Sequence, residues 1–226
     1  MSDCQDVSPP ARKRVLVVDD HEIVRRGWQF LISSETDLEV CGEAGTADQA
    51  LELTEQLHPD VVVTCICLPG RTGLDLVKTL KTQHPHLPVL VVSTLDEKIF
   101  GERVLKAGGM GYLMKEAACE QLVIAVRQVL LGRYHVSEAL SERFLAGAAS
   151  GGTSKFPLER LTNREMQVFQ LMGQGRSLEE IAEEQGIAVR TVEAHRTHMR
   201  SKLGLADSKE LLRYAVRCFE SGDYGN

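Results

Sequence analysis

Side chains that can hold a cation or a phosphoryl group follow four short apolar segments in the first half of the chain. They are Asp19 and Asp20, Cys65, Ser93 and Lys115. Paired carboxylates are hard oxygen ligands that suit Mg²⁺, and a hydroxyl and an ammonium can bind phosphoryl oxygens. Because the carboxyl ends of parallel strands meet at one edge of a sheet, we expect these side chains to share a pocket.

The segments before these residues are rich in β-branched side chains, and stretches with apolar residues at i, i+3 and i+4 separate them. The apolar runs are 15–18, 38–41, 61–63, 89–92 and 111–114, and the helical stretches are 21–33, 46–57, 73–84, 97–107 and 117–131. Five strand–helix units predict an α/β doubly wound domain. We expect a five-stranded parallel sheet of the flavodoxin-like kind, with helices on both faces.

The alternation ends after Gly132, and residues 147–154 (GAASGGTS) have the composition of a flexible linker. Beyond Leu158 the pattern predicts only helices, which begin at capping boxes such as Thr162–Glu165 and Ser177–Glu180. We therefore predict a disordered N-terminal tail over 1–12, a first domain over 13–132, a linker over 133–156 and a small all-α domain of four helices over 157–222.

Within the second domain, residues 181–200 have the form of a helix-turn-helix motif. A helix over 181–185 is followed by Gly186, a short turn and a second helix that begins near Arg190. Val192, Met199 and Leu203 share the predicted buried side of this second helix, so its other sides are available to DNA. The candidate DNA contacts are Arg190, Thr191, Glu193, Ala194, Arg196, Thr197, Arg200 and Lys202. A solvated helix in an ordinary bundle has the same spacing.

The last predicted helix, over 209–220, has a wide apolar stripe. Its members are Leu211, Leu212, Ala215, Val216 and Phe219. The stripe is explained either by a dimer contact, which would set two recognition helices about one DNA turn apart, or by packing inside the domain. The pattern alone does not separate these alternatives.

Composition is that of a folded protein, with 226 residues, 43% hydrophobic and 26% charged. No apolar run approaches the roughly 18 residues of a membrane span, and the N-terminus lacks the features of a secretory signal, so we expect a cytoplasmic protein without membrane contact. The net charge of −6 argues against bulk electrostatic coating of nucleic acid. From residue 155 on, however, 11 basic and 11 acidic residues balance, so the first part of the chain carries the deficit.

The stretches VLVVDDHEIVRRG, PDVVVTCICLPGRTGLDLVKTL, VLVVST and KAGGMGYLMK resemble the receiver domain of two-component response regulators. The line from Leu161 to Leu205 resembles the LuxR-type helix-turn-helix domain, and together they are similar to the NarL/FixJ subgroup. The resemblance implies double-stranded DNA, a second copy of the chain and a sensor histidine kinase as partners, and no catalytic residue. It also implies that Asp19 and Asp20 hold Mg²⁺, Lys115 pairs with a phosphoryl oxygen, Ser93 is the switch hydroxyl and Tyr112 the aromatic that turns inward with it.

One position departs from the resemblance, because Cys65 stands where the family has its phosphoryl-accepting aspartate. A thiol cannot form an acyl phosphate, and hard cations prefer oxygen, so the Mg²⁺ expectation is weakened too. Three explanations are open: a degenerate receiver that works without phosphorylation, a substitution introduced into an ordinary regulator, or a thiol switch with Cys67. Two residues two apart on one strand lie at a marginal distance for a disulfide.

The sequence therefore predicts a DNA-binding transcriptional regulator of the response-regulator class, dimeric and with an atypical receiver. The alternative is a protein-interaction or thiol-switch module whose DNA binding is weak or secondary. An enzyme with Cys65 as nucleophile is disfavoured, because no histidine is expected beside it. The helix at Arg190 also lacks a usual capping side chain, since Ala188 precedes it.

Overall fold

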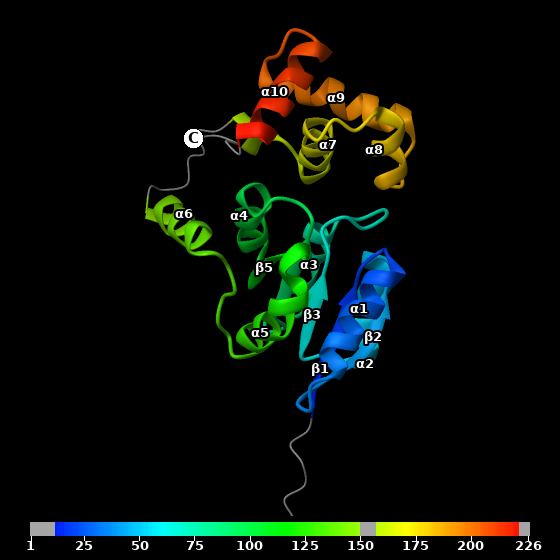
Figure 1. Cartoon of the computed structure of the whole chain (residues 1–226), viewed down its shortest axis with the longest axis vertical. Coiled ribbons are helices and arrows are strands. Elements are labelled where there is room, and N and C mark those ends of the chain that lie inside the picture. The colour runs from blue at the N-terminus through cyan, green and yellow to red at the C-terminus, as the bar shows by residue number, and fades with distance from the viewer. Residues whose placement is uncertain (1–11, 150–156, 222–226) are drawn as a thin grey trace, which may run out of the picture.

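The computed structural model describes residues 12–149 and 157–221, which form an N-terminal α/β domain and a C-terminal helical domain (Figure 1). The predicted tail lies outside these residues except for Arg12, as does part of the glycine-rich stretch. Among the described helices, none is long and apolar enough to cross a bilayer.

The N-terminal domain is built on one parallel sheet of five strands, as predicted. The strands are β1 (Lys13–Val18), β2 (Leu38–Ala44), β3 (Val61–Thr64), β4 (Val89–Ser93) and β5 (Gly111–Met114). Their order across the sheet is β2-β1-β3-β4-β5. The chain order reverses between β1 and β3, and in doubly wound sheets ligands bind in the crevice at such a point.

Five helices connect and follow the strands. They are α1 (Glu22–Ser33), α2 (Ala47–Leu57), α3 (Gly73–Gln83), α4 (Glu97–Ala107) and α5 (Ala118–Leu130), the last preceded by the short 3₁₀ turn η1 (Lys115–Ala117). Helix α1 contacts α5, whereas α3 contacts both α2 and α4, so the two groups cover opposite faces of the sheet. Residues 15–18 of β1 and 61–63 of β3 are fully buried, as expected for strands covered on both faces.

Gly73, the first residue of α3, packs directly against the end of β3. A Cβ atom here would lie 1.8 Å from the backbone oxygen of Cys65. Its backbone N–H also donates to the backbone oxygen of Ile66 at 2.8 Å. The helix start therefore fixes the backbone just after Cys65, and only glycine allows this close approach.

The chain after α5 is more ordered than the linker prediction for 133–156 implied. His135 forms an isolated bridge with Gly111 at the edge of the sheet, and a helix, α6 (Glu138–Ala149), follows. Leu140 of α6 is buried against Gly101 of α4. The apolar side chain at position 140 thus anchors to α4 a segment in which no helix was expected.

The C-terminal domain consists of helices, as predicted. After the 3₁₀ turn η2 (Pro157–Arg160) come α7 (Asn163–Gly173), α8 (Leu178–Glu184), α9 (Val189–Leu203) and α10 (Ser208–Ser221). Thr162 and Ser177 form complete capping boxes with Glu165 and Glu180. At Ala188, before α9, no side-chain cap is formed, as its sequence indicated.

Candidate functional site

The pocket at the carboxyl edge of the sheet is centred on Asp19, whose side chain is fully buried after β1. Its Oδ2 lies 2.5 Å from Nζ of Lys115, which comes from the end of β5. Its Oδ1 accepts the backbone N–H of His21 at 3.0 Å. The structure thus brings together residues that are nearly a hundred positions apart in the chain.

His21 is a member of the pocket that sequence reasoning missed. Its Nδ1 lies 2.9 Å from Asp20 Oδ1 and 3.5 Å from Asp19 Oδ1. Among the described residues, these three form the one group of acidic and imidazole side chains whose ligand atoms lie within 4.8 Å of one another. Its place directly after two aspartates at a strand end was the signal that would have identified it. The expectation that no histidine lies near this set was therefore wrong.

Cys65 lies in the same pocket and is 2% exposed. Its Sγ donates to the backbone oxygen of Cys67 at 3.0 Å and is 4.0 Å from Asp20 Oδ1. Burial raises the pKa of Cys65 well above that of an ordinary thiol; Asp19 adds to the rise and Lys115 opposes it. The group is thus a protonated thiol at neutral pH, and it turns toward its own loop.

Cys67 is also a free thiol, and burial raises its pKa to about 11. Its Sγ lies 3.9 Å from Nε2 of Gln185, in the C-terminal domain. Thiolates are the reactive form of cysteine, so a buried and a half-buried thiol, both with raised pKa values, do not favour the thiol-switch explanation.

The donor atoms of the pocket do not fit Mg²⁺, which demands near-ideal octahedral coordination by oxygen. One oxygen of Asp19 is held by Lys115, and Oδ1 of Asp20 lies 2.9 Å from an imidazole nitrogen and 4.0 Å from a sulfur. Nitrogen and sulfur are ligands of softer cations. We therefore derive no step of the protein's action through Mg²⁺.

Ser93 and Tyr112 lie together inside the first domain. Tyr112 is 2% exposed, and its hydroxyl donates to the backbone oxygen of Leu95 at 2.6 Å. The backbone N–H of Leu95 donates to Ser93 Oγ at 3.2 Å. Both side chains are therefore linked to the same residue of the β4–α4 loop, and Tyr112 is turned inward.

Arg164, at the start of α7, joins the C-terminal domain to the loop that follows Cys65. Its Nη2 donates to the backbone oxygens of Leu68 at 2.9 Å and Gly70 at 2.6 Å. Its Nη1 donates to Gln185 Oε1 at 2.8 Å, within its own domain. Gln167 Nε2 adds a longer bond of 3.4 Å to the backbone oxygen of Ile66. The loop after β3 is thus a docking surface for the helix-turn-helix motif.

Arg103 of α4 forms the second junction between the domains, this time from the N-terminal side. Its guanidinium donates to the backbone oxygens of Leu158 at 3.0 Å and Leu161 at 2.9 Å, and to Asn163 Oδ1 at 3.3 Å. Two arginines, one from each domain, therefore hold the C-terminal domain above the carboxyl edge of the sheet (Figure 1).

Helix α9 presents much of its predicted DNA face to solvent. Arg190, Glu193, Ala194 and Thr197 are exposed, whereas Thr191, Arg196, Arg200 and Lys202 are half-buried. On the opposite side, Val192 and Met199 are fully buried, and Leu203 is half-buried rather than buried. The expected division of α9 into a core side and a more open side is therefore present.

Lys202, which the sequence analysis predicted as a DNA contact, has a partner within the protein. Its Nζ lies 2.6 Å from Oε2 of Glu165, whose side chain is 4% exposed. Burial alone would raise the pKa of Glu165, but the ion pair with Lys202 and the amide of Thr162 outweigh it and lower that pKa below its usual value. The ammonium thus helps to hold α9 against the start of α7.

We expect Lys202→Met to lower the free energy of unfolding by about 1–3 kcal/mol, because it leaves a nearly buried carboxylate without its charged partner. Lys202 is about a third exposed, which limits the effect. Because the folded-state pKa of Glu165 is lowered, its contribution is present at neutral pH and is lost as pH falls through that pKa. Urea unfolding at neutral pH measures the loss of stability, and unfolding at acid pH measures how far that loss depends on the charge of Glu165. The exposed Lys209→Met is the control. Unchanged stability with weakened DNA binding would instead assign Lys202 to phosphate.

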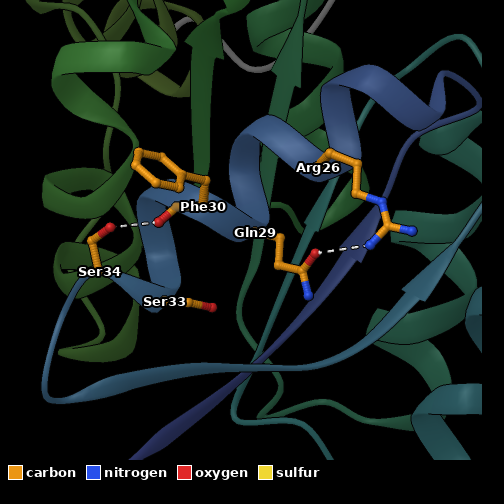
Figure 2. A pocket seen from close by; sticks show the side chains of 5 residues that line it. All are labelled: Arg26, Gln29, Phe30, Ser33 and Ser34. Atoms are coloured by element: carbon orange, nitrogen blue, oxygen red, sulfur yellow. Dashed lines mark hydrogen bonds between the residues drawn. The ribbon is translucent and has the colours of Figure 1, made fainter.

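A further hollow lies on the outer side of α1, lined by Arg26, Gln29, Phe30, Ser33 and Ser34 (Figure 2). The hydroxyl of Ser34 donates to the backbone oxygen of Phe30 at 2.7 Å, and Arg26 Nη1 lies 3.5 Å from Gln29 Oε1. These polar atoms are therefore engaged with one another along the helix, away from the carboxyl edge of the sheet.

Two family models match the two domains. The response regulator receiver domain matches residues 15–127, and the LuxR family of bacterial regulatory proteins matches residues 159–215. The chain belongs to the LuxR family of response regulators. It is thus a DNA-binding transcription regulator of a two-component system.

Relatives of this regulator match nearly its whole length. The oxygen regulatory protein NreC of Staphylococcus aureus is 30% identical over 210 residues, which cover 90% of this chain and 97% of NreC. RcsB from Salmonella enterica serovar Typhimurium, solved bound to promoter rprA with the phosphomimetic BeF3−, has a TM-score of 0.60 at 25% identity, covering 91% of this chain and 98% of RcsB. The response regulator ChrA of a heme-sensing two-component system is 31% identical with a TM-score of 0.50, covering 92% and 97%.

Proposed function

We propose that this regulator binds its operator as a dimer through α9 and is controlled without an acyl phosphate on its receiver. Control without an acyl phosphate is supported by the position of Cys65, which is buried in the strand-end pocket beside Asp20. A thiol there offers no carboxylate to accept a phosphoryl group. A sensor kinase remains a partner expected from the family, and its effect on this chain would come from binding rather than from an aspartyl phosphate.

We propose that the exposed side of α9 enters the major groove. Its candidate base and phosphate contacts are Arg190, Thr191, Glu193, Ala194, Arg196, Thr197 and Arg200, with Lys202 assigned to Glu165 instead. A guanidinium can bond both acceptors of guanine, and a carboxylate can accept from cytosine N4. RcsB, which shares this fold, has been solved on promoter DNA. Such a protein acts where the DNA lies, in the cytoplasm.

The dimer contact proposed here is the outer side of α10. Leu211, Ala215 and Cys218 are buried within the domain, whereas Leu212 and Phe219 are each 43% exposed and Val216 between them is half-buried. In this proposal both explanations of the apolar stripe apply, to two adjacent sides of one helix. The outer side is an apolar strip of three residues at helical spacing, which a second copy of α10 would cover.

Regulation, in this proposal, depends on how firmly the two domains are docked. Arg164 holds the C-terminal domain against Leu68 and Gly70 of the loop after β3, and Arg103 of α4 holds Leu158 and Leu161 at the start of that domain. Pro69 lies beside Gly186, in the turn that precedes α9. Since the first residues of a recognition helix reach the bases, the adjacent receiver loop occupies space that the duplex needs. Undocking would then permit DNA binding.

The test of DNA binding is a shift assay over a range of salt concentrations, with a selected operator. We expect Arg190→Ala to weaken binding by about 1–3 kcal/mol if it reads a base, and affinity to fall steeply with salt in proportion to phosphate contacts. Arg213→Ala, an exposed arginine on α10, serves as the control. A chain that shifts no selected sequence at low salt would support the alternative, a protein-interaction module.

A further inference from the structure

Residues 66–70, which follow Cys65, form the docking loop of the receiver. Its backbone oxygens accept hydrogen bonds from side chains of the DNA-binding domain. The oxygens of Leu68 and Gly70 are held by Arg164, and the oxygen of Ile66 is held by Gln167. Because these acceptors belong to the backbone, docking depends on the path of the loop rather than on its side chains.

Two groups of the receiver fix this path. At the start of α3, the backbone N–H of Gly73 donates to the oxygen of Ile66 at 2.8 Å. From the other end, Cys65 Sγ donates to the backbone oxygen of Cys67 at 3.0 Å. The bond from Cys65 therefore holds the peptide oxygen that directly precedes the Leu68 oxygen bound by Arg164.

The thiol of Cys65 is suited to this bond because it keeps its proton. The side chain is 2% exposed, and burial raises its pKa well above that of an ordinary thiol, so it is a donor at neutral pH. An ionised carboxylate, by contrast, only accepts hydrogen bonds. An aspartate at position 65 would face the Cys67 oxygen with like partial charge, and the bond would be absent.

We propose that Cys65 is a positioning residue, whose thiol holds the docking loop in the form that Arg164 binds. The thiol would then stabilise the docked state as well as replace the acceptor carboxylate. This inference rests on the proposed control by docking and names the group that sets it. One neutral hydrogen bond shifts such an equilibrium by about fivefold.

The test is the rate at which a maleimide labels Cys67 in the reduced full-length protein, followed by peptide mass spectrometry. Cys67 is half-buried beside Gln185, so undocking should expose its thiol. Cys65→Ala, which has no donor, should raise the rate by about fivefold. Cys65→Ser keeps a hydroxyl donor and should label at the wild-type rate. Arg103→Ala, which removes the other junction between the domains, should raise the rate too.

Two other thiols of the chain are internal controls. Cys119 is exposed and should label rapidly in every variant, whereas Cys218 is buried in α10 and should label slowly in every variant if the DNA-binding domain stays folded. A wild-type rate at Cys67 in Cys65→Ala, or an equal rise in Cys65→Ser, would overturn the proposal.

Operator affinity, measured on the same variants, separates this role of Cys65 from control by docking. If docking inhibits, Cys65→Ala should bind the operator about fivefold more tightly and Cys65→Ser should bind it as the wild type does. Faster labelling of Cys67 at unchanged operator affinity would support the positioning role of Cys65 and contradict inhibition by docking.

Discussion

Arg103→Ala is expected to tighten operator binding by about tenfold. The side chain donates hydrogen bonds to Leu158, Leu161 and Asn163 of the C-terminal domain, and a hydrogen bond that involves a charged group contributes about 1.5–3 kcal/mol net of its exchange with water. A loss of about 1.4 kcal/mol, close to the contribution of one such bond, is therefore a modest expectation, and it is tenfold in an equilibrium constant. If docked chains cannot bind DNA, the apparent affinity rises with the undocked fraction.

Arg103 is a more specific target than Arg164 for this experiment, because it belongs to the receiver and its substitution leaves the DNA-binding domain unaltered. Arg164 also bonds Gln185 and Gln167 inside the DNA-binding domain, so its removal would alter that domain as well. Arg26→Ala, on the outer side of α1, is the matched control and should leave affinity unchanged. X-ray scattering in solution should show a more extended Arg103→Ala chain. An extended chain with unaltered DNA affinity would show that docking does not inhibit.

The sheet was predictable because its signal is local. Each strand is a short β-branched run, and each helix repeats apolar residues at helical spacing. The spacing of apolar residues was therefore enough to distinguish strands from helices. The same reasoning missed α6, because its neighbours are glycine-rich and, among those of its side chains that the structure describes, Leu140 alone is buried. A single anchoring residue leaves almost no periodic pattern in the sequence.

The strand-end pocket could be predicted from topology, since Asp19, Cys65, Ser93 and Lys115 each follow a parallel strand. His21 was missed although it directly follows the two aspartates, because the direction of its side chain, which folds back on them, is not part of the topology. The ion pair of Lys202 depends on a different helix and was equally invisible from the pattern of α9.

The docking between domains was beyond sequence reasoning for a further reason. Arg164 and Arg103 bind mainly backbone oxygens, at Leu68 and Gly70 in one case and at Leu158 and Leu161 in the other. Every residue has a backbone oxygen, so these partners leave no mark in the choice of side chains. An arginine in a helix-turn-helix domain is moreover interpreted first as a contact to DNA, and not as a contact to the receiver domain.

Cys65→Asp is expected to convert a chain that takes up no acyl phosphate into one that does. The surroundings of an acceptor carboxylate are in place: Lys115 is present at the pocket, Asp20 lies 4.0 Å from the Sγ position, and Ser93 is the last residue of the neighbouring strand. Mg²⁺ would be held by the oxygen-rich set that the new carboxylate restores. With a small phosphodonor and Mg²⁺, intact mass spectrometry should show one acid-labile phosphoryl group on Cys65→Asp and none on the wild type.

Cys65→Ala and Cys65→Asn are the controls for this conversion, since neither supplies a nucleophilic carboxylate. A labile phosphoryl group on Cys65→Ala would mean that a different side chain accepts it, and Asp20 would be the first to substitute. A phosphorylated Cys65→Asp chain also separates two consequences of the thiol. If phosphorylation changes operator affinity, the switch formed by Ser93, Tyr112 and the docked domain has been retained. Cys65 then removes only the ability of the receiver to accept a phosphoryl group. If affinity stays the same, the receiver has lost its coupling to α9 as well, and the hydrogen bonds of Arg164 and Arg103 are docking contacts with no regulatory effect.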